Sequence, residues 1–157
     1  MGTEIERKFL LKGKLSDYDF EYTAIDRIEQ CYVMLEDNKE LRVRMIRHMN
    51  SGQFDEVRYV MTAKAGEGLI RTEVEVEISK KEYVALKRYS NGRNIAKKRY
   101  TTKDHFMIDV FEDKNIPNIV EVEFPNEDYA NKFTPPEWFG EEVTNNINYS
   151  NKMLAMM

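Results

Sequence analysis

Residues 72–78 read Thr-Glu-Val-Glu-Val-Glu-Ile, a strict alternation of acidic and aliphatic side chains after the first residue. Successive side chains of a β-strand point to opposite faces of its sheet, so the three glutamates share one face and the aliphatic residues share the other. Like charges two residues apart on one strand face repel each other mildly. The acidic face of this strand therefore needs a compensating group, either cations on neighbouring strands or a bound ion.

The same alternation recurs along the chain and predicts eight strands. Their expected bounds are 3–11, 25–35, 41–49, 54–64, 72–78, 95–103, 105–112 and 118–124. A helix is predicted after Ser79, where Ser79 and Glu82 form a capping box, and it ends before Asn91-Gly92. Shorter helices are expected at 126–132 and 144–156. No repeat or linker interrupts the pattern, so residues 1–157 are expected to form a single domain.

Composition excludes several classes of protein. The chain of 157 residues carries 24 Lys and Arg and 28 Asp and Glu, or 33% charged residues, against about 25% in an average soluble protein. The net charge of −4 disfavours a broadly basic nucleic-acid binder, so no nucleic-acid partner is expected. No apolar stretch approaches the ~18 residues of a membrane span, and the N-terminus lacks the pattern of a signal peptide. A cytoplasmic location is therefore expected.

The polar face of each predicted strand is filled mainly by charged groups, and their signs are segregated by strand. A closed barrel with these faces inward would enclose eight acids and seven bases. The acids are Glu4, Glu6, Glu73, Glu75, Glu77, Asp109, Glu121 and Glu123, and the bases are Lys8, Arg42, Arg44, Arg58, Lys64, Lys97 and Arg99. An antiparallel sheet with one face in water shows a similar alternation. However, a solvated face usually mixes neutral polar residues with both signs of charge.

The segregated charges favour a small anionic ligand together with a metal ion. An eight-stranded barrel is just wide enough to hold one small ligand. Carboxylates bind Mg²⁺, which tends to share its coordination sphere with substrate phosphates, while Arg and Lys bind phosphate oxygens directly. A metal-bound polyphosphate therefore fits the predicted interior better than bulk water does.

Several motifs follow one another in the order of a known family. The first is Glu4-Ile5-Glu6-Arg7-Lys8, an E-x-E-x-K pattern. The later ones are Gln30-Cys31-Tyr32, Arg42-Val43-Arg44, Thr62-Ala63-Lys64, Arg71-Thr72-Glu73-Val74-Glu75, Lys97 with Arg99, Asp109-Val110 and Glu121-Val122-Glu123-Phe124. With the tail PPEWFGEEVT at 135–144, the whole chain resembles the CYTH superfamily of triphosphate tunnel metalloenzymes, and most closely its small bacterial inorganic triphosphatases.

The resemblance implies a mainly β fold, an eight-stranded antiparallel closed barrel or triphosphate tunnel with a few short flanking helices. It implies Mg²⁺ or Mn²⁺ as cofactor, with metal ligands at Glu4, Glu6, Glu121 and Glu123. The implied phosphate-binding residues are Lys8, Arg42, Arg44, Lys64, Lys97, Arg99 and Lys152. The catalytic set that it implies is Glu4, Glu6, Lys8, Glu73, Glu75 and Asp109.

The implied reaction is metal-dependent hydrolysis of inorganic tripolyphosphate to pyrophosphate and phosphate, with nucleoside triphosphates as further substrates. A class IV adenylate cyclase, a thiamine-triphosphatase and a non-catalytic module that binds polyphosphate or nucleotides remain alternatives. A homodimer is left open, and so is the role of Trp138 and Phe139, which would either anchor the C-terminal segment or cover the tunnel. Glu77 would lie in the tunnel or at its solvent-facing mouth.

Overall fold

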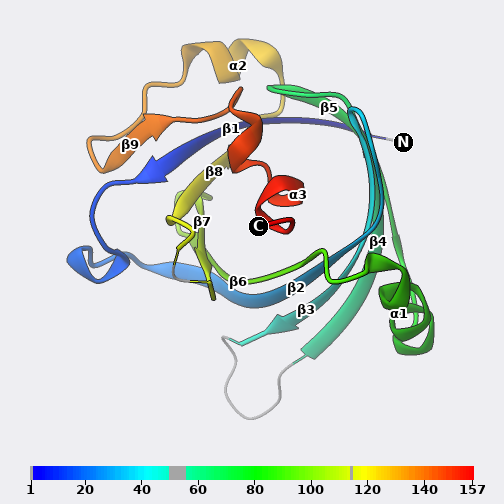
Figure 1. The fold of residues 1–157 in the computed structure, drawn as a ribbon. Coiled ribbons are helices and arrows are strands. Elements are labelled where there is room, and N and C mark those ends of the chain that lie inside the picture. Colours follow the sequence, from blue (N-terminus) through cyan, green and yellow to red (C-terminus); the bar gives the residue numbers. More distant parts are fainter. Residues whose placement is uncertain (1, 50–55, 114) are drawn as a thin grey trace.

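The computed structural model describes residues 2–49, 56–113 and 115–157, and their strands form a closed antiparallel barrel (Figure 1). The barrel strands are β1 (Gly2–Leu11), β2 (Tyr22–Glu36), β3 (Lys39–His48), β4 (Glu56–Ala65), β5 (Ile70–Glu77), β6 (Asn94–Thr102), β7 (Met107–Phe111) and β8 (Ile119–Glu123). They are hydrogen-bonded in the order β5-β4-β3-β2-β6-β7-β8-β1, and β1 pairs back onto β5. The expected eight-stranded antiparallel barrel is therefore confirmed.

Strand boundaries differ little from the expected ones. Residues 54–55 of the expected strand 54–64 lie outside the described residues. The strand expected at 105–112 begins two residues later because His105 has a positive φ of 68° and belongs to the turn between β6 and β7. Thr102 and Phe106 join across this turn, where the Thr102 backbone N–H donates to the Phe106 carbonyl at 2.8 Å.

A ninth strand, β9 (Phe139–Glu142), was not predicted from the sequence, and it pairs with the end of β1. Residues 2–5 of β1 pair with β5 along the same edge, whereas β8 occupies the other edge. Gly140 allows this close pairing, since a Cβ at that position would lie 3.0 Å from the Leu10 carbonyl oxygen. A strand of four residues with a glycine carries too weak an alternation to be recognised from sequence.

Two of the three expected helices are confirmed. Helix α1 (Lys80–Lys87) begins at the Ser79 capping box, in which the Glu82 backbone N–H donates to Ser79 Oγ at 3.1 Å. It continues as a 3₁₀ turn, η2 (Arg88–Ser90), and Asn91 follows with φ 50°. Helix α2 (Glu127–Lys132) starts at the expected cap, Asn126. A further 3₁₀ turn, η1, spans Leu15–Asp17.

The expected helix at 144–156 is wrong, because this segment forms two short turns of helix. The 3₁₀ turn η3 spans Ile147–Tyr149, and α3 spans Asn151–Leu154. Asn146 accepts a hydrogen bond from the Asn148 backbone N–H, and Ser150 accepts one from that of Met153. Side chains of Asn and Ser that bind nearby backbone groups start new turns and interrupt a continuous helix.

The C-terminal segment closes one end of the barrel. Figure 1 looks into the barrel and shows α3 within the ring of strands. Leu154 and the adjacent Ala155 are buried against Tyr32, Ile95 and Ile119, whose side chains point inward. The interior therefore ends at an apolar layer on this side, and the charged residues lie beyond it.

A second apolar cluster covers the outside of β1, β7 and β8. Phe9 and Phe139 pack with ring centroids 4.9 Å apart, and Trp138 lies 4.5 Å from Phe139 and 4.6 Å from Phe20. Phe139 is 5% exposed. Trp138 and Phe139 thus anchor the C-terminal segment to the outer wall and do not cover the interior. Within the described residues, no helix is long and apolar enough to cross a membrane.

Arg7, the fourth residue of the E-x-E-x-K motif, belongs to this outer wall. Its guanidinium pairs with both carboxylate oxygens of Glu142 at 2.7 and 2.8 Å, and donates to the carbonyls of Ala130 and Phe133 at 2.9 and 3.0 Å. It also lies over the Phe9 ring at 5.2 Å. One side chain thus ties α2 and β9 to β1.

We expect Arg7→Ala to lower the free energy of unfolding by about 1–3 kcal/mol, because several hydrogen bonds to a partly exposed charge are lost together. Urea unfolding followed by Trp138 fluorescence measures the change. Lys12→Ala is the control, since it removes a single exposed side-chain hydrogen bond to the Glu137 carbonyl among the described residues and should cost no more than about 0.5 kcal/mol. Equal effects of the two substitutions would contradict the assigned role of Arg7.

Candidate active site

The barrel interior holds a cavity of about 200 Å³, here called the lumen. Its walls carry seven acidic and seven basic side chains, together with Gln30, Ser150 and Asn151. The acids are Glu4, Glu6, Glu40, Glu73, Glu75, Glu121 and Glu123, and the bases are Lys8, Arg42, Arg44, Lys64, Arg71, Lys97 and Arg99. Among the described residues, no aliphatic or aromatic side chain lines this cavity.

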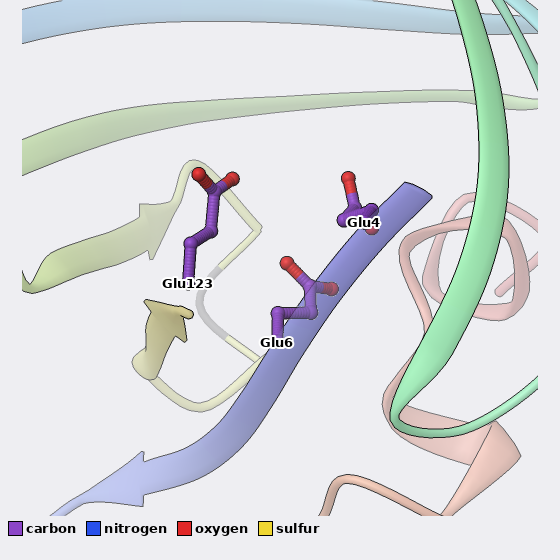
Figure 2. Close-up of side chains that lie close together, drawn as sticks. All are labelled: Glu4, Glu6 and Glu123. Atoms are coloured by element: carbon purple, nitrogen blue, oxygen red, sulfur yellow. The ribbon is translucent and has the colours of Figure 1, made fainter. Parts of the chain in front are cut away.

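Three of the acids converge on one point. Glu4, Glu6 and Glu123 each offer a carboxylate oxygen, and these oxygens lie within 4.8 Å of one another. Glu4 and Glu6 share the inner face of β1, and the β1–β8 register places Glu6 opposite Glu123. Figure 2 shows the three carboxylates around a common space. Hard divalent cations take such oxygen ligands, so the donor set suits a metal ion.

The negative charges of this cluster are only partly balanced by nearby cations, as the pKa values of its carboxyl groups show. Burial, followed by the negative charge of Glu121, raises the pKa of Glu6 to about 7. Burial and the charge of Glu4 also raise the pKa of Glu123. Burial would raise the pKa of Glu4 as well, but the Lys64 ammonium, 2.9 Å away, outweighs it and lowers that pKa. A cation added to the cluster would favour its ionised form.

Opposite β1, the cationic wall is also incompletely paired. Arg42 is 6% exposed and makes no ion pair with any residue in the described part of the chain. The Nε atoms of Arg42 and Arg44 and the Oε1 atom of Gln30 are buried without a hydrogen-bond partner. Burial and the nearby charge of Arg42 lower the pKa of Arg44, although its guanidinium pairs with Glu75 at 2.9 Å. Buried donors without partners are costly, so this wall is suited to an anion.

A third group of charges is fully paired. Asp109 is completely buried beneath the lumen wall, where its two oxygens accept from Lys97 and Arg99, each at 2.7 Å. Arg99 also pairs with Glu121 at 3.0 Å, and Lys8 lies 3.7 Å from Glu121. The Lys97 ammonium donates in addition to Asn151 of α3 at 3.2 Å. This network positions two cations at the lumen wall.

The structure brings most of the predicted site residues into the lumen. Asp109 lies beneath its wall, and Lys152 lines a neighbouring pocket. Arg58 was expected inside, and that expectation is wrong. Glu77 was expected either in the tunnel or at its solvent-facing mouth, and its exposure fits the second position. The two residues pair with each other at 3.2 Å, with side chains 38% and 74% exposed. Glu77 ends β5 beyond the residues that pair with β1, so the wall has opened to solvent there.

Five residues that line the lumen were not predicted from the sequence: Gln30, Glu40, Arg71, Ser150 and Asn151. Glu40 and Arg71 continue the inward alternation of their strands by two residues, so the pattern could have identified them. Gln30 lies on β2, where no inward charged residue marks the face. Glu40 is 4% exposed and pairs with Arg71 at 3.0 Å. Ser150 and Asn151 come from the C-terminal segment, whose insertion into the barrel has no signal in the sequence.

Comparisons with known sequences identify two relatives of this chain. No family model matches the chain. A curated protein of Nitrosomonas europaea named inorganic triphosphatase is 38% identical over 98% of this chain and 97% of its own length. Another of the same name, from Acetivibrio thermocellus, is 28% identical over 99% of this chain and 94% of its own length.

Comparison with solved structures also finds an inorganic triphosphatase. The crystal structure of the inorganic triphosphatase NE1496 covers 100% of this chain and 97% of its own, with 36% identity and a TM-score of 0.64. The PH1819 protein of Pyrococcus horikoshii is 21% identical with a TM-score of 0.55, over 80% of this chain and 81% of its own, and shows the fold alone. Given 38% identity to a curated relative over nearly the full length of both chains, the protein belongs to the inorganic triphosphatase family that its sequence motifs resemble.

Proposed function

We propose that the protein hydrolyses inorganic tripolyphosphate to pyrophosphate and phosphate in the lumen, with the help of a divalent metal ion. The observation that carries this proposal is the lumen itself, where an acidic cluster faces cations that are buried and not fully paired. A metal-bound polyphosphate supplies both missing partners. The names of the relatives from Nitrosomonas and Acetivibrio support the same substrate.

The proposed metal is Mg²⁺ or Mn²⁺, held by Glu4, Glu6 and Glu123. Glu121 lies near this cluster, but its ion pairs with Arg99 and Lys8 make it a better partner of the cations than of the metal. When bound, the ion would polarise phosphoryl oxygens and offset part of the substrate charge.

The proposed phosphate ligands are the cations of the lumen wall: Lys8, Arg42, Arg44, Lys64, Lys97 and Arg99. Their charges stabilise the negative charge that develops on the phosphoryl oxygens as the terminal bond breaks. Glu73 and Glu75 lie beside two of these cations, with Glu73 3.7 Å from Lys64 and Glu75 2.9 Å from Arg44. We assign them to orienting the cations and the attacking water. Asp109 acts as a positioning residue for Lys97 and Arg99, and no covalent nucleophile is required.

The chemistry of the lumen also favours an inorganic substrate over an organic one. A volume of about 200 Å³ is below the roughly 300–1,000 Å³ of sites for drug-sized ligands. With no aromatic or aliphatic lining among the described residues, a nucleobase or thiazolium ring has nothing to stack on. This disfavours the adenylate cyclase and thiamine-triphosphatase alternatives. The acidic cluster disfavours a module that only binds phosphate.

We expect kcat/KM for tripolyphosphate to exceed that for ATP and for thiamine triphosphate by at least about tenfold, since only the phosphates find partners in the lumen. Released phosphate, pyrophosphate and cyclic AMP are measured with Mg²⁺ or Mn²⁺ for each substrate. Cyclic AMP as the main product from ATP would instead identify a cyclase. Tight tripolyphosphate binding without any product would identify a binding module.

Glu4→Ala and Glu6→Ala should each reduce metal-dependent tripolyphosphate hydrolysis at least about 100-fold, because each removes a proposed metal ligand. Circular dichroism should show that the barrel is retained. Glu77→Ala is the matched control, since Glu77 is exposed outside the lumen, and it should change kcat/KM by less than about twofold. Near-normal turnover in either of the first two variants would disprove the metal assignment.

Metal binding should strengthen as the pH rises to about 7, because the proton that Glu6 holds below this pH competes with the ion. The pKa of Glu6 is raised from 4.5 to about 7 in the folded chain, so protonation stabilises the metal-free protein at low pH. That stabilisation is lost as the pH rises through about 7. Mg²⁺ should therefore raise the melting temperature more at pH 8 than at pH 6, and Glu6→Gln should remove the difference. An unchanged pH dependence in Glu6→Gln would show that another group titrates.

A further inference from the structure

A smaller cavity of about 80 Å³ lies beside the lumen, and the proposed reaction does not account for it. The charged residues of this side pocket are Glu6, Lys8, Glu67, Arg71 and Lys152. Glu6, Lys8, Arg71 and Ser150 also line the lumen. The two cavities therefore share a wall.

The side pocket exists because the strands beside β1 leave a gap. Along one edge of β1, the last contact with the start of β5 is the hydrogen bond from the Glu6 N–H to the Leu69 carbonyl, at 3.1 Å. The next contact is the bond from the Val143 N–H to the Lys8 carbonyl, at 2.8 Å, where β9 has just ended. Beside these two points, residues of the β4–β5 turn and of the segment after β9 line the side pocket.

Two glycines shape the outer side of the side pocket. Gly66 and Gly68 have φ values of +104° and +77°, which other residues rarely adopt. A Cβ on Gly68 would lie 2.8 Å from the Asn145 side-chain oxygen, so the turn and the C-terminal segment approach closely there. Backbone of the turn and amide groups of the C-terminal segment thus enclose the pocket on this side.

The charges of the side pocket suit an anion. Three of the five charged residues are cations, and Lys152 makes no ion pair in the part of the chain that the structure describes. Arg71 is held at the shared wall by Glu40 at 3.0 Å and by the Gly66 carbonyl at 3.1 Å. Asn145, Asn146 and Ser150 add neutral hydrogen-bonding groups. The small volume admits a group of a few heavy atoms, which is the size of one phosphate.

We propose that the side pocket is a second phosphate site, connected to the lumen through the gap beside β1. Its occupant is either the next unit of a longer linear polyphosphate or the orthophosphate released by hydrolysis. The two ligands share the same chemistry, and the experiment below separates them. The proposal rests on the proposed triphosphatase activity of the lumen. Polyphosphate bound in the lumen would place its next unit in the side pocket, and hydrolysis would release orthophosphate beside it.

Glu67 provides the test because it is exposed, lines the side pocket and is absent from the lumen. Glu67→Lys reverses the charge that opposes an anion there, so phosphate should bind about threefold to tenfold more tightly. Glu67→Gln should give a smaller change of the same sign, and Lys152→Gln should change binding in the opposite direction. For tripolyphosphate, the KM of Glu67→Lys should stay within about twofold of the original.

Two kinetic measurements distinguish the occupants. Orthophosphate in the side pocket would inhibit tripolyphosphate hydrolysis without competing with the substrate. If orthophosphate occupies the pocket, Glu67→Lys therefore lowers the constant for this non-competitive inhibition. If the next unit of a chain occupies it, the variant lowers KM for tetrapolyphosphate. Glu137→Lys is the control, because it makes the same charge change at an exposed residue that lines neither cavity.

The proposal is overturned if Glu67→Lys changes neither constant, or if Glu137→Lys changes them equally. Calorimetric titration of orthophosphate into the metal-free chain compares the same variants without relying on turnover. A chain that fails to hydrolyse tripolyphosphate would refute the proposed function alone. In that case, tighter orthophosphate binding by Glu67→Lys than by Glu137→Lys would still support the side pocket.

Discussion

A carboxylate with no exposure to solvent, Asp109, holds together the charged interior of this barrel. It accepts hydrogen bonds from Lys97 and Arg99, and Arg99 also forms an ion pair with Glu121. Transferring such groups from water into a protein costs several kcal/mol each, which is recovered only where opposite charges meet with good geometry. The paired charges around Asp109 meet this condition and give the lumen one rigid wall.

Elsewhere in the lumen the opposite charges are not fully paired, and this contrast supports the proposed positions of the metal ion and the polyphosphate. Glu6 has its pKa raised to about 7 by burial and by neighbouring acids, while Arg42 and Arg44 each bury an Nε atom without a partner. The incompletely compensated acids and the incompletely compensated bases belong to different strands. A metal ion and a polyphosphate would complete both sets at once, and their binding would then offset the cost of burying these charges.

Strand β1 links the fold to the site. Its inner face carries Glu4, Glu6 and Lys8, and its outer face carries Arg7, which clamps α2 and β9. One edge pairs with β8, and the other passes from β5 to β9. The change of partner leaves the gap at which the side pocket joins the lumen. A five-residue motif thus supplies two of the clustered carboxylates, one cation of the lumen and the side chain that ties α2 and β9 to β1.

Much of this architecture could be predicted from the sequence, because period-two alternation fixes which side chains share a face. Residues such as Glu73 and Arg44 were placed inward on that ground alone, and extending the pattern would have added Glu40 and Arg71. The alternation does not say where a barrel ends, however, so Arg58 was placed inside and Glu77 could not be assigned to the tunnel or to its mouth, although the wall is open there. Only the tertiary structure decided the strand register, which brings Glu6 opposite Glu123, and the insertion of α3 into the barrel. Both depend on contacts between residues far apart in the chain, and local periodicity carries no information about them.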